Sequence, residues 1–212
     1  METDQTVLKC LSENLAGKRQ DVIDRFPHRI AVFSDNPKAL NTGEISMKSK
    51  LWKFLYEAIE AGITTLFTGL SYGGDSAAAE HFAQRKQTNS DLRIVHIQQS
   101  RSWFAEIEPC LKGFAANTLI NCTDYATIIS GPNPEKSKLY RDQFIIDQCL
   151  HIVFLTDLED DSENLYSWQL FEYATSSHKN SISHQIHMIG CAEQYIPSEP
   201  EKPAEPRQDS LF

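Results

Sequence analysis

Residues 64–80 read TTLFTGLSYGGDSAAAE, and this stretch decides the fold class. It begins with a β-branched and aromatic run, residues 64–68, which is typical of a buried strand. The glycine-rich segment 69–74 follows, and an alanine-rich helix begins at Asp75 and continues to about Lys86. A strand that ends in a glycine-rich loop and leads directly into a helix is the first half of a βαβ unit.

Short apolar runs and helical patterns alternate on both sides of this unit. Apolar runs of strand length occur at residues 29–33, 92–97, 125–129, 151–155 and 185–189. Helical spacing of apolar residues occurs between the strands, at residues 44–61, 75–86, 103–112, 135–149 and 164–177. Strands that alternate with helices predict a parallel sheet with both faces covered. We therefore expect an α/β fold, namely a Rossmann-like three-layer α/β/α arrangement with a mostly parallel sheet.

The chain of 212 residues is long enough for one large domain with extensions. We expect an N-terminal helical lead-in over residues 1–28, one Rossmann-like domain over residues 29–192, and a tail over residues 193–212. The lead-in is predicted to end at Pro27, because the residue before a proline disfavours helix. The tail has four prolines between positions 197 and 206 and no apolar pattern, which is typical of a disordered segment.

Charge and composition exclude several classes of protein. The formal net charge of −9 argues against a general nucleic-acid binder, which needs a basic footprint. No apolar run approaches the roughly 20 residues that cross a bilayer, and the acidic start Met1-Glu2-Thr3-Asp4 lacks the apolar centre of a signal peptide. The five cysteines form no C-x-x-C pair, and free thiols suit a reducing compartment. We expect a cytoplasmic protein with no membrane contact, no metal site and no cofactor.

The loop from Thr68 to Asp75 is the strongest candidate site, because ligands of open α/β sheets bind outside the carboxyl ends of the strands. Its glycines allow close backbone approach, and the N–H groups that begin the next helix attract an anion. Asp75 would repel a phosphate beside it but would accept hydrogen bonds from a ribose or a base. A plain glycine-rich turn capped by Asp75 is an equally good interpretation. The predicted phosphate or ribose cradle consists of Thr68, Gly69, Ser71, Gly73, Gly74 and Asp75.

Two further groups of residues complete the predicted site. Ser34, Asp35 and Asn36 follow the first strand and would form the wall opposite the glycine-rich loop, although the same residues suit an Asx turn. Arg141 lies near the start of a helix and would neutralise a phosphate, with a surface ion pair to Asp142 or Glu135 as the alternative.

Other polar groups of the sequence are interpreted as structural or exposed. The acidic stretch 157–163 suits a cation or a basic partner, but an exposed loop is the simpler interpretation. His96, His151 and His187 lie inside strands, and we expect core histidines or histidines with satisfied hydrogen bonds. No Ser/His/Asp order with an elbow motif and no H-E-x-x-H motif is present, so catalytic residues are not identified.

Two segments resemble a known family. Residues 67–80, FTGLSYGGDSAAAE, are similar to the glycine-rich signature of the SLOG superfamily, in particular its YpsA-like branch. Residues 140–149, YRDQFIIDQC, are similar to a second segment of that branch, and a strand, an acidic turn and Tyr173-Ala174 follow in the expected order. The matches span about residues 29–190. The resemblance implies a Rossmann-like fold related to LOG and DprA-type domains, a nucleotide-derived ligand and a homodimer.

The chain departs from the family pattern in two loops. The family often has G-H-R after the first strand, where this chain has residues 33–37, FSDNP. The glycine turn G-G-T before the last helix appears here as Leu165-Tyr166-Ser167, so that only the hydroxyl of Ser167 remains as a donor. The P-G-G-x-G-T-x-x-E motif of the LOG enzymes, which cleave nucleoside monophosphates, is absent. The resemblance therefore implies binding more than catalysis.

Three functions follow from the sequence, in order of preference. The first is binding of a nucleotide or nucleotide-derived small molecule at the glycine-rich loop, in a sensing or regulatory role. The second is a nucleotide hydrolase or N-glycosidase that uses Asp75, Glu80 or a carboxylate of residues 157–163 as acid or base. The third is a protein-interaction scaffold that has lost its ligand, which the missing glycines and the acidic, proline-rich tail suggest.

Overall fold

The computed structural model of the chain describes most of the predicted domain. The described residues are 26–34, 47–71, 73–106, 109–129, 136–156, 166–176 and 184–190. Asp35, Asn36 and the acidic stretch 157–163 lie outside these residues, as do the predicted lead-in up to residue 25, the last two residues of the predicted domain and the predicted tail over residues 193–212. What the sequence predicts for these segments stays a prediction.

All six predicted strands are present, and their limits differ from the predicted ones by no more than one residue at most ends. The strands are β1 (Arg29–Ser34), β2 (Thr65–Thr68), β3 (Arg93–Gln98), β4 (Tyr125–Ile128), β5 (His151–Thr156) and β6 (Gln185–Gly190). The helices of the described residues are η1 (Phe26–His28), α3 (Met47–Glu60), α4 (Gly74–Lys86), α5 (Trp103–Glu106), α6 (Pro109–Asn121), α7 (Ser137–Asp147) and α8 (Tyr166–Ser176). Within this part of the chain no helix is long and apolar enough to cross a membrane.

The strands form one parallel sheet in the order β4-β3-β2-β1-β5-β6, which confirms the Rossmann-like fold. The chain proceeds from β1 outward through β2, β3 and β4, and then returns to place β5 and β6 on the other side of β1. The order of strands therefore reverses between β1 and β5, where Ser34 pairs with Leu155 in register. In sheets of this kind a crevice for ligands opens at the carboxyl ends of the two strands that flank the reversal.

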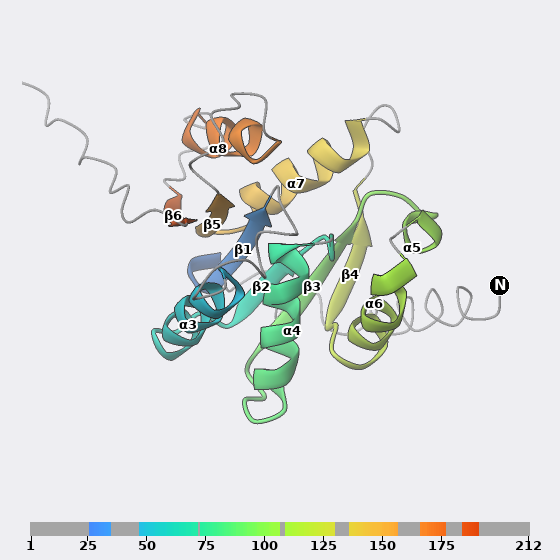
Figure 1. Cartoon of the computed structure of the whole chain (residues 1–212), viewed down its shortest axis with the longest axis horizontal. Helices are drawn as coiled ribbons and strands as arrows, with labels where there is room; N and C mark the ends of the chain where they lie inside the picture. The colour runs from blue at the N-terminus through green and yellow to red at the C-terminus, as the bar shows by residue number, and fades with distance from the viewer. Residues whose placement is uncertain are drawn as a thin grey trace, which may run out of the picture.

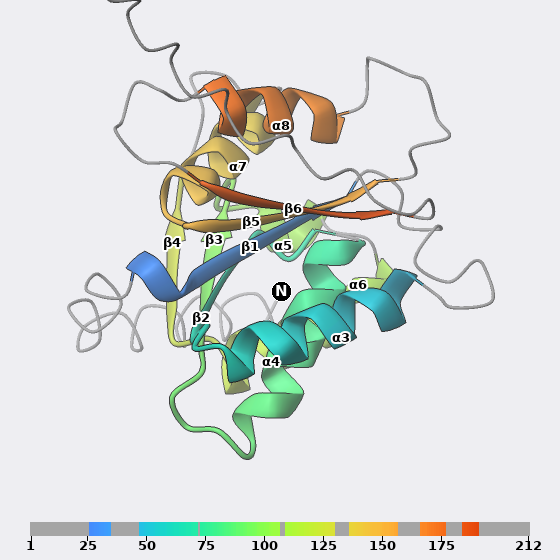
Figure 2. The ribbon, with the colours of Figure 1, turned by 90° about the vertical axis from the view of Figure 1, so that its left-hand side faces the viewer.

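Helices cover both faces of the sheet (Figures 1 and 2). In Figure 2, α7 and α8 lie above the sheet, and α3, α4 and α6 lie below it. Alternate residues of β1 point to opposite layers: Ile30 and Val32 pack with the α3–α4–α6 layer, whereas Ala31 and Phe33 pack with the α7–α8 layer. Each layer thus has an apolar core, as expected for buried parallel strands.

The two helices that follow β1 and β2 pack against the sheet in different ways. In α3, large apolar residues recur every four positions on the buried face, namely Met47, Leu51, Leu55 and Ile59. The turn after α3 places Gly62 at φ 106°, a positive φ that favours glycine and is common just after the end of a helix. In α4 the buried face is made of small residues, which include Ala77, Ala78 and Ala79. Small side chains let α4 approach the sheet closely, and its first turn therefore lies beside the ends of β1 and β5.

The prediction of helix over residues 103–112 is confirmed at the described residues 103–106 and 109–112, but its end at residue 112 is wrong. The structure has a short helix, α5, and a separate helix, α6, which begins at Pro109 and extends to Asn121. Proline is well tolerated in the first turn of a helix, because the N–H that it lacks has no helical partner there. The buried residues Ala115 and Thr118 anchor the part of α6 that the sequence reading missed.

Candidate functional site

The glycine-rich loop after β2 is organised around the side chain of Asp75. Asp75 is the second residue of α4, and its carboxylate turns back toward the end of β2. The backbone N–H groups of Gly69 and Ser71 donate to its Oδ2 atom at 3.1 Å and 3.0 Å, and the Thr68 hydroxyl donates to Oδ1. The interpretation of Asp75 as the helix cap is wrong, because Gly73 occupies the cap position at φ 120° without a side-chain cap. The carboxylate of Asp75 instead satisfies the N–H groups of its own loop.

Ser34 connects the end of β1 to the start of α4. Its hydroxyl oxygen accepts a hydrogen bond of 2.8 Å from the backbone N–H of Gly74. A Cβ atom on Gly74 would lie 2.5 Å from the Cδ1 atom of Leu155 on β5, so a larger residue here would have to displace that side chain. The predicted wall and the predicted cradle therefore meet directly, at the reversal between β1 and β5.

Arg141, on α7, is buried against the same loop. Its residue is 1% exposed, and its Nε atom donates to Oδ1 of Asp142 at 2.6 Å. Its Nη2 atom donates to the Ser71 hydroxyl at 2.9 Å. A Cβ atom on Gly69 would lie 2.5 Å from the guanidinium carbon, so the glycine makes room for the arginine. The predicted ion pair with Asp142 exists, but it lies in the interior and not on the surface as the alternative reading had it.

Tyr166 links this ion pair to α8. Its hydroxyl donates to Oδ2 of Asp142 at 2.7 Å, so the carboxylate of Asp142 receives one donor on each oxygen. The network therefore runs from α8 through Asp142 and Arg141 on α7 to Ser71 in the glycine-rich loop. Three segments that are distant in the sequence are held together by hydrogen bonds to charged groups, which are stronger than those between neutral groups.

Burial acts differently on the pKa values of Asp75 and Arg141, two groups of the network whose pKa is shifted. Burial raises the pKa of the Asp75 carboxyl to about 6, against the opposing effects of the Arg141 charge and the donors Thr68 and Ser71. Burial acts to lower the pKa of Arg141, but the carboxylates of Asp142 and Asp75 raise it above its ordinary value. Arg141 is therefore a permanent cation, whereas Asp75 exchanges its proton close to neutral pH.

A small pocket opens beside this network, at the carboxyl end of β1. Lys138 is the exposed cation at the pocket, and its Nζ atom lies 4.1 Å from the centre of the Tyr166 ring. The volume open to water inside the pocket is small, about 20 Å³, which is room for one small polar group. The pocket is lined by Val32, Phe33, Ser34, Ser71, Asp75, Lys138, Asp142, Tyr166 and Ser167.

The structure brings together most of the residues that the sequence predicts for the site. Ser34, Ser71, Asp75 and Ser167 line the pocket, with Ser167 as the second residue of α8. Thr68, Gly69, Gly74 and Arg141 do not line the pocket but support residues that do. Gly73 provides the turn into α4. Asp35 and Asn36 lie outside the described residues.

Five pocket residues were not predicted as site residues: the apolar Val32 and Phe33, and the polar Lys138, Asp142 and Tyr166. One signal in the sequence could have identified two of them. Lys138 and Asp142 are four positions apart on α7, so they lie on the same face of the helix, next to Arg141. The contribution of Tyr166 has no such signal, because it depends on how α8 lies beside α7.

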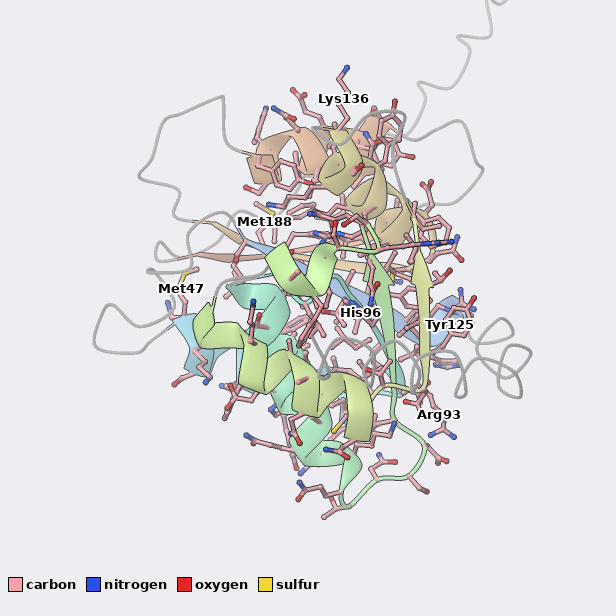
Figure 3. The ribbon with its side chains drawn as sticks, turned by 90° about the vertical axis from the view of Figure 1, so that its right-hand side faces the viewer. Met47, Arg93, His96, Tyr125, Lys136 and Met188 are labelled. Carbon is pink, nitrogen blue, oxygen red and sulfur yellow. The ribbon has the colours of Figure 1, made fainter. Side chains whose placement is uncertain are left out.

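Other candidate residues of the sequence lie away from the pocket. Glu80 forms an ion pair of 2.7 Å with Lys48 on α3. His96 is fully buried, with its ring centre 4.6 Å from that of Trp103, and burial and the Arg141 charge lower its pKa to about 3. Figure 3 shows His96 within the body of the molecule. Its complete burial confirms the prediction of a core histidine, and neither ring nitrogen has a geometric hydrogen-bond partner among the described residues.

The other two histidines predicted inside strands form a pair. His151 and His187 lie half-buried on neighbouring strands, with Nδ1 of His151 and Nε2 of His187 3.3 Å apart. Burial lowers the pKa of both imidazoles. In the part of the chain that the structure describes, no group of three or more histidine, cysteine or acidic residues is placed to hold a metal ion.

Comparison with known proteins adds no assignment to this geometry. No protein-family model matches the chain, and no curated protein matches it. The functional argument therefore depends on the fold and on the residues around the pocket.

Proposed function

We propose that this protein binds a nucleotide or nucleotide-derived small molecule in the pocket beside Ser34 and Asp142, and that it serves as a cytoplasmic sensor or regulator. The resemblance of residues 67–80 and 140–149 to the YpsA-like branch of the SLOG superfamily is consistent with this function. The proposal is supported by where the pocket lies and by which groups line it.

The observation that carries the proposal is the buried ion pair of Arg141 and Asp142 next to the pocket. The side chains are 2% and 4% exposed. Removing two charges from water costs several kcal/mol per ion, so a buried pair is a weak way to stabilise a fold. Such a pair at the strand ends where Rossmann-like folds bind ligands is better explained by a site than by packing.

The pocket lining suits the sugar and phosphate of a nucleotide. Ser34, Ser71 and Ser167 contribute hydroxyl groups, Asp142 contributes a carboxylate, and Lys138 contributes a positive charge. Phe33 and Tyr166 add apolar surface. Small-molecule sites typically combine an apolar lining with a few placed polar groups.

Binding is favoured over catalysis because Asp75, the pocket acid with the pKa closest to neutral pH, already accepts three hydrogen bonds within the protein. Asp75 accepts hydrogen bonds from Thr68, Gly69 and Ser71, which leaves little of its carboxylate for a substrate. One observation nevertheless favours hydrolysis of an N-glycosidic bond as a second candidate. The pKa of about 6 would let Asp75 deliver a proton near neutral pH. Incubation with a panel of nucleotides, followed by detection of free base, tests this candidate, and binding without product release eliminates it.

A thermal-shift screen tests the proposed function. The panel consists of nucleoside mono-, di- and triphosphates, NAD, ADP-ribose and cyclic nucleotides. A ligand at about 100 times its Kd stabilises the fold by about 2.7 kcal/mol, which is readily measured. We expect at least one compound to raise the Tm of the wild type.

A matched pair of variants localises the ligand. Ser34→Leu extends an apolar side chain into the pocket, whereas Ser34→Thr keeps the hydroxyl that accepts from the N–H of Gly74. We expect the ligand-induced shift to vanish in Ser34→Leu and to persist in Ser34→Thr. An equal shift in both variants would place the ligand elsewhere, and no shift with any compound on the wild type would refute the function.

A further inference from the structure

The position that a glycine-rich loop normally offers to a phosphate is filled by the protein itself. Phosphates in such loops are held by backbone N–H groups at the start of a helix. Here the loop N–H groups of Gly69 and Ser71 and the hydroxyl of Thr68 all donate to the carboxylate of Asp75, and the N–H of Gly74, the first residue of α4, donates to the hydroxyl of Ser34. An incoming phosphate would find these donors taken and would be repelled by the negative charge.

The deep part of the pocket is suited to hydroxyl groups. A carboxylate has about four acceptor positions, and that of Asp142 uses two of them, for Arg141 and Tyr166. The remaining positions can accept from a ligand hydroxyl. The hydroxyl oxygens of Ser34 and Ser71 accept from Gly74 and Arg141, so their own protons are left to donate to another group. Carboxylates and hydroxyl donors side by side match a sugar diol, which both donates and accepts.

A positive charge lies at the exposed side of the pocket. Lys138 is exposed, and among the described residues it has no ion-pair partner. Its ammonium group lies against the face of the Tyr166 ring, 4.1 Å from the ring centre, which holds the charge at the pocket. The other charged residues that line the pocket are the acids Asp75 and Asp142. An anionic group is therefore attracted to the outside of the pocket and repelled from its interior.

The small volume of the pocket fits only part of a nucleotide. About 20 Å³ is open to water inside it, so the hydroxyl edge of a ribose can enter while the rest of the molecule stays outside. The order of groups from inside to outside is then diol, sugar and phosphate.

We propose that the ligand is a ribonucleotide whose ribose diol points inward, to Asp142 and Ser34, and whose phosphate lies outside the glycine-rich loop, at Lys138. This inference rests on the proposed function and deepens it by naming the ligand class and its orientation. It reverses the arrangement expected from the sequence, in which the loop residues 68–75 would hold the phosphate.

Calorimetric titration with dissected ligands tests the orientation. The probes are the 5′-monophosphates of the four ribonucleosides, the corresponding nucleosides and 2′-deoxy monophosphates, and inorganic phosphate. The proteins are the wild type, Lys138→Gln, and Lys53→Gln, which removes the same charge from an exposed position of α3 on the other side of the sheet. For the monophosphate that binds, we expect its nucleoside and its 2′-deoxy analogue each to bind about tenfold more weakly or worse, the latter because a hydrogen bond to a charged group is lost. Inorganic phosphate should not bind.

The lysine variants separate the phosphate contact from the ribose contact. Lys138→Gln should reduce the affinity for the monophosphate to that for the nucleoside and leave nucleoside binding unchanged, whereas Lys53→Gln should behave as the wild type does. A monophosphate that binds Lys138→Gln as tightly as the wild type, or that inorganic phosphate displaces, overturns the orientation while the proposed function stands. Binding of other panel compounds but of no monophosphate also overturns the orientation alone. If no compound of the thermal-shift panel or of this series binds, both proposals fail.

Discussion

Two buried aspartates with basic partners lie at opposite ends of the sheet, and they differ in what surrounds them. Asp124 lies at the amino end of β4, and its carboxylate accepts hydrogen bonds from the ammonium group of Lys86 and, at 2.9 Å, from the backbone N–H of Ile94. The backbone N–H of Asp124 donates to the carbonyl of Ile94 at 2.9 Å. Asp142 lies near the carboxyl ends of the strands, beside the pocket, and its carboxylate accepts hydrogen bonds from Arg141 and Tyr166. Asp124 links β4 to β3 by hydrogen bonds. Asp142 links α7 to α8 beside the pocket, and its partner Arg141 extends the network to the glycine-rich loop.

The exposure of the basic partners sharpens this difference. The Lys86 side chain is 21% exposed, whereas that of Arg141 is 2% exposed. Lys86 can return to water if its partner is lost, but Arg141 cannot. Figure 3 shows the separation of the two ends, with Arg93 at the amino end of β3 and Lys136 beside the start of α7. The comparison teaches that a buried acid is evidence for a site only when its partner is trapped and a pocket adjoins it.

The largest effect is expected from Asp142→Asn. This change keeps the shape of the side chain but removes the counter-charge that is hydrogen-bonded to the buried Arg141 guanidinium, and the free energy of unfolding should fall by about 3–5 kcal/mol. The free energy of unfolding of each protein is measured by urea denaturation. The double variant Arg141→Met/Asp142→Asn should recover much of the loss, because it removes the stranded charge. A single variant within about 1 kcal/mol of the wild type would show that Arg141 is solvated, contrary to the structure.

The next effect is the pH dependence that Asp75 contributes. Its pKa is raised from 3.8 to about 6, so the folded state binds the proton more tightly than the unfolded chain. The stabilisation by the proton is therefore complete below about pH 4 and is lost as the pH rises through about 6. Relative to Asp75→Asn, the free energy of unfolding of the wild type should fall by up to about 3 kcal/mol across this range and stay constant above it.

Subtracting the variant removes the contributions of other titrating groups to this pH profile. NMR titration of the Asp75 carboxyl carbon gives the pKa directly. A midpoint near the ordinary value of 3.8, with no change in the stability difference between wild type and variant, would contradict this account of the loop.

A smaller effect is expected from Asp124→Asn, the counterpart of Asp142→Asn at the amino end. Lys86 can extend into water, and the amide oxygen of asparagine can still accept from the N–H of Ile94. The free energy of unfolding should fall by about 1–2 kcal/mol, as measured by the same denaturation. A loss as large as that of Asp142→Asn would remove the distinction between the two ends.

The smallest effect is expected from Tyr166→Phe, which removes the hydroxyl that donates to Asp142. The loss of one such hydrogen bond should lower the free energy of unfolding by about 1 kcal/mol and change ligand affinity more than stability. Tyr140→Phe is the control, because Tyr140 is 41% exposed on the same helix as Asp142. Equal effects of the two changes would argue against a specific role of Tyr166.

The fold could be predicted from the sequence because its signals are local. Each strand is a short apolar run, and α3 shows its buried face through Leu51, Leu55 and Ile59. The end of α6 was predicted wrongly because the local signals are weak there. Pro109 was not recognised as the start of a helix, and the residues that bury α6 do not form a strong periodic pattern.

The site could be predicted only in part, because its contacts are made between distant segments. The loop at Gly69 to Gly74 was identified from its composition, and Arg141 was identified beside it. The orientation of the Asp75 carboxylate depends on the path of the backbone over the seven residues from Thr68, and the meeting of Asp142 with Tyr166 depends on how α7 and α8 pack. Neither the orientation of the Asp75 carboxylate nor the contact of Asp142 with Tyr166 can be predicted from the spacing of residue types along the chain.

A crystal structure of the protein soaked with the tightest-binding compound of the nucleotide panel tests the central claim most directly. The account predicts density in the pocket between Ser34, Asp142 and Lys138, with the side chain of Asp75 still bonded to the N–H groups of Gly69 and Ser71. A nucleotide bound elsewhere on the molecule, away from the carboxyl ends of β1 and β5, would contradict it.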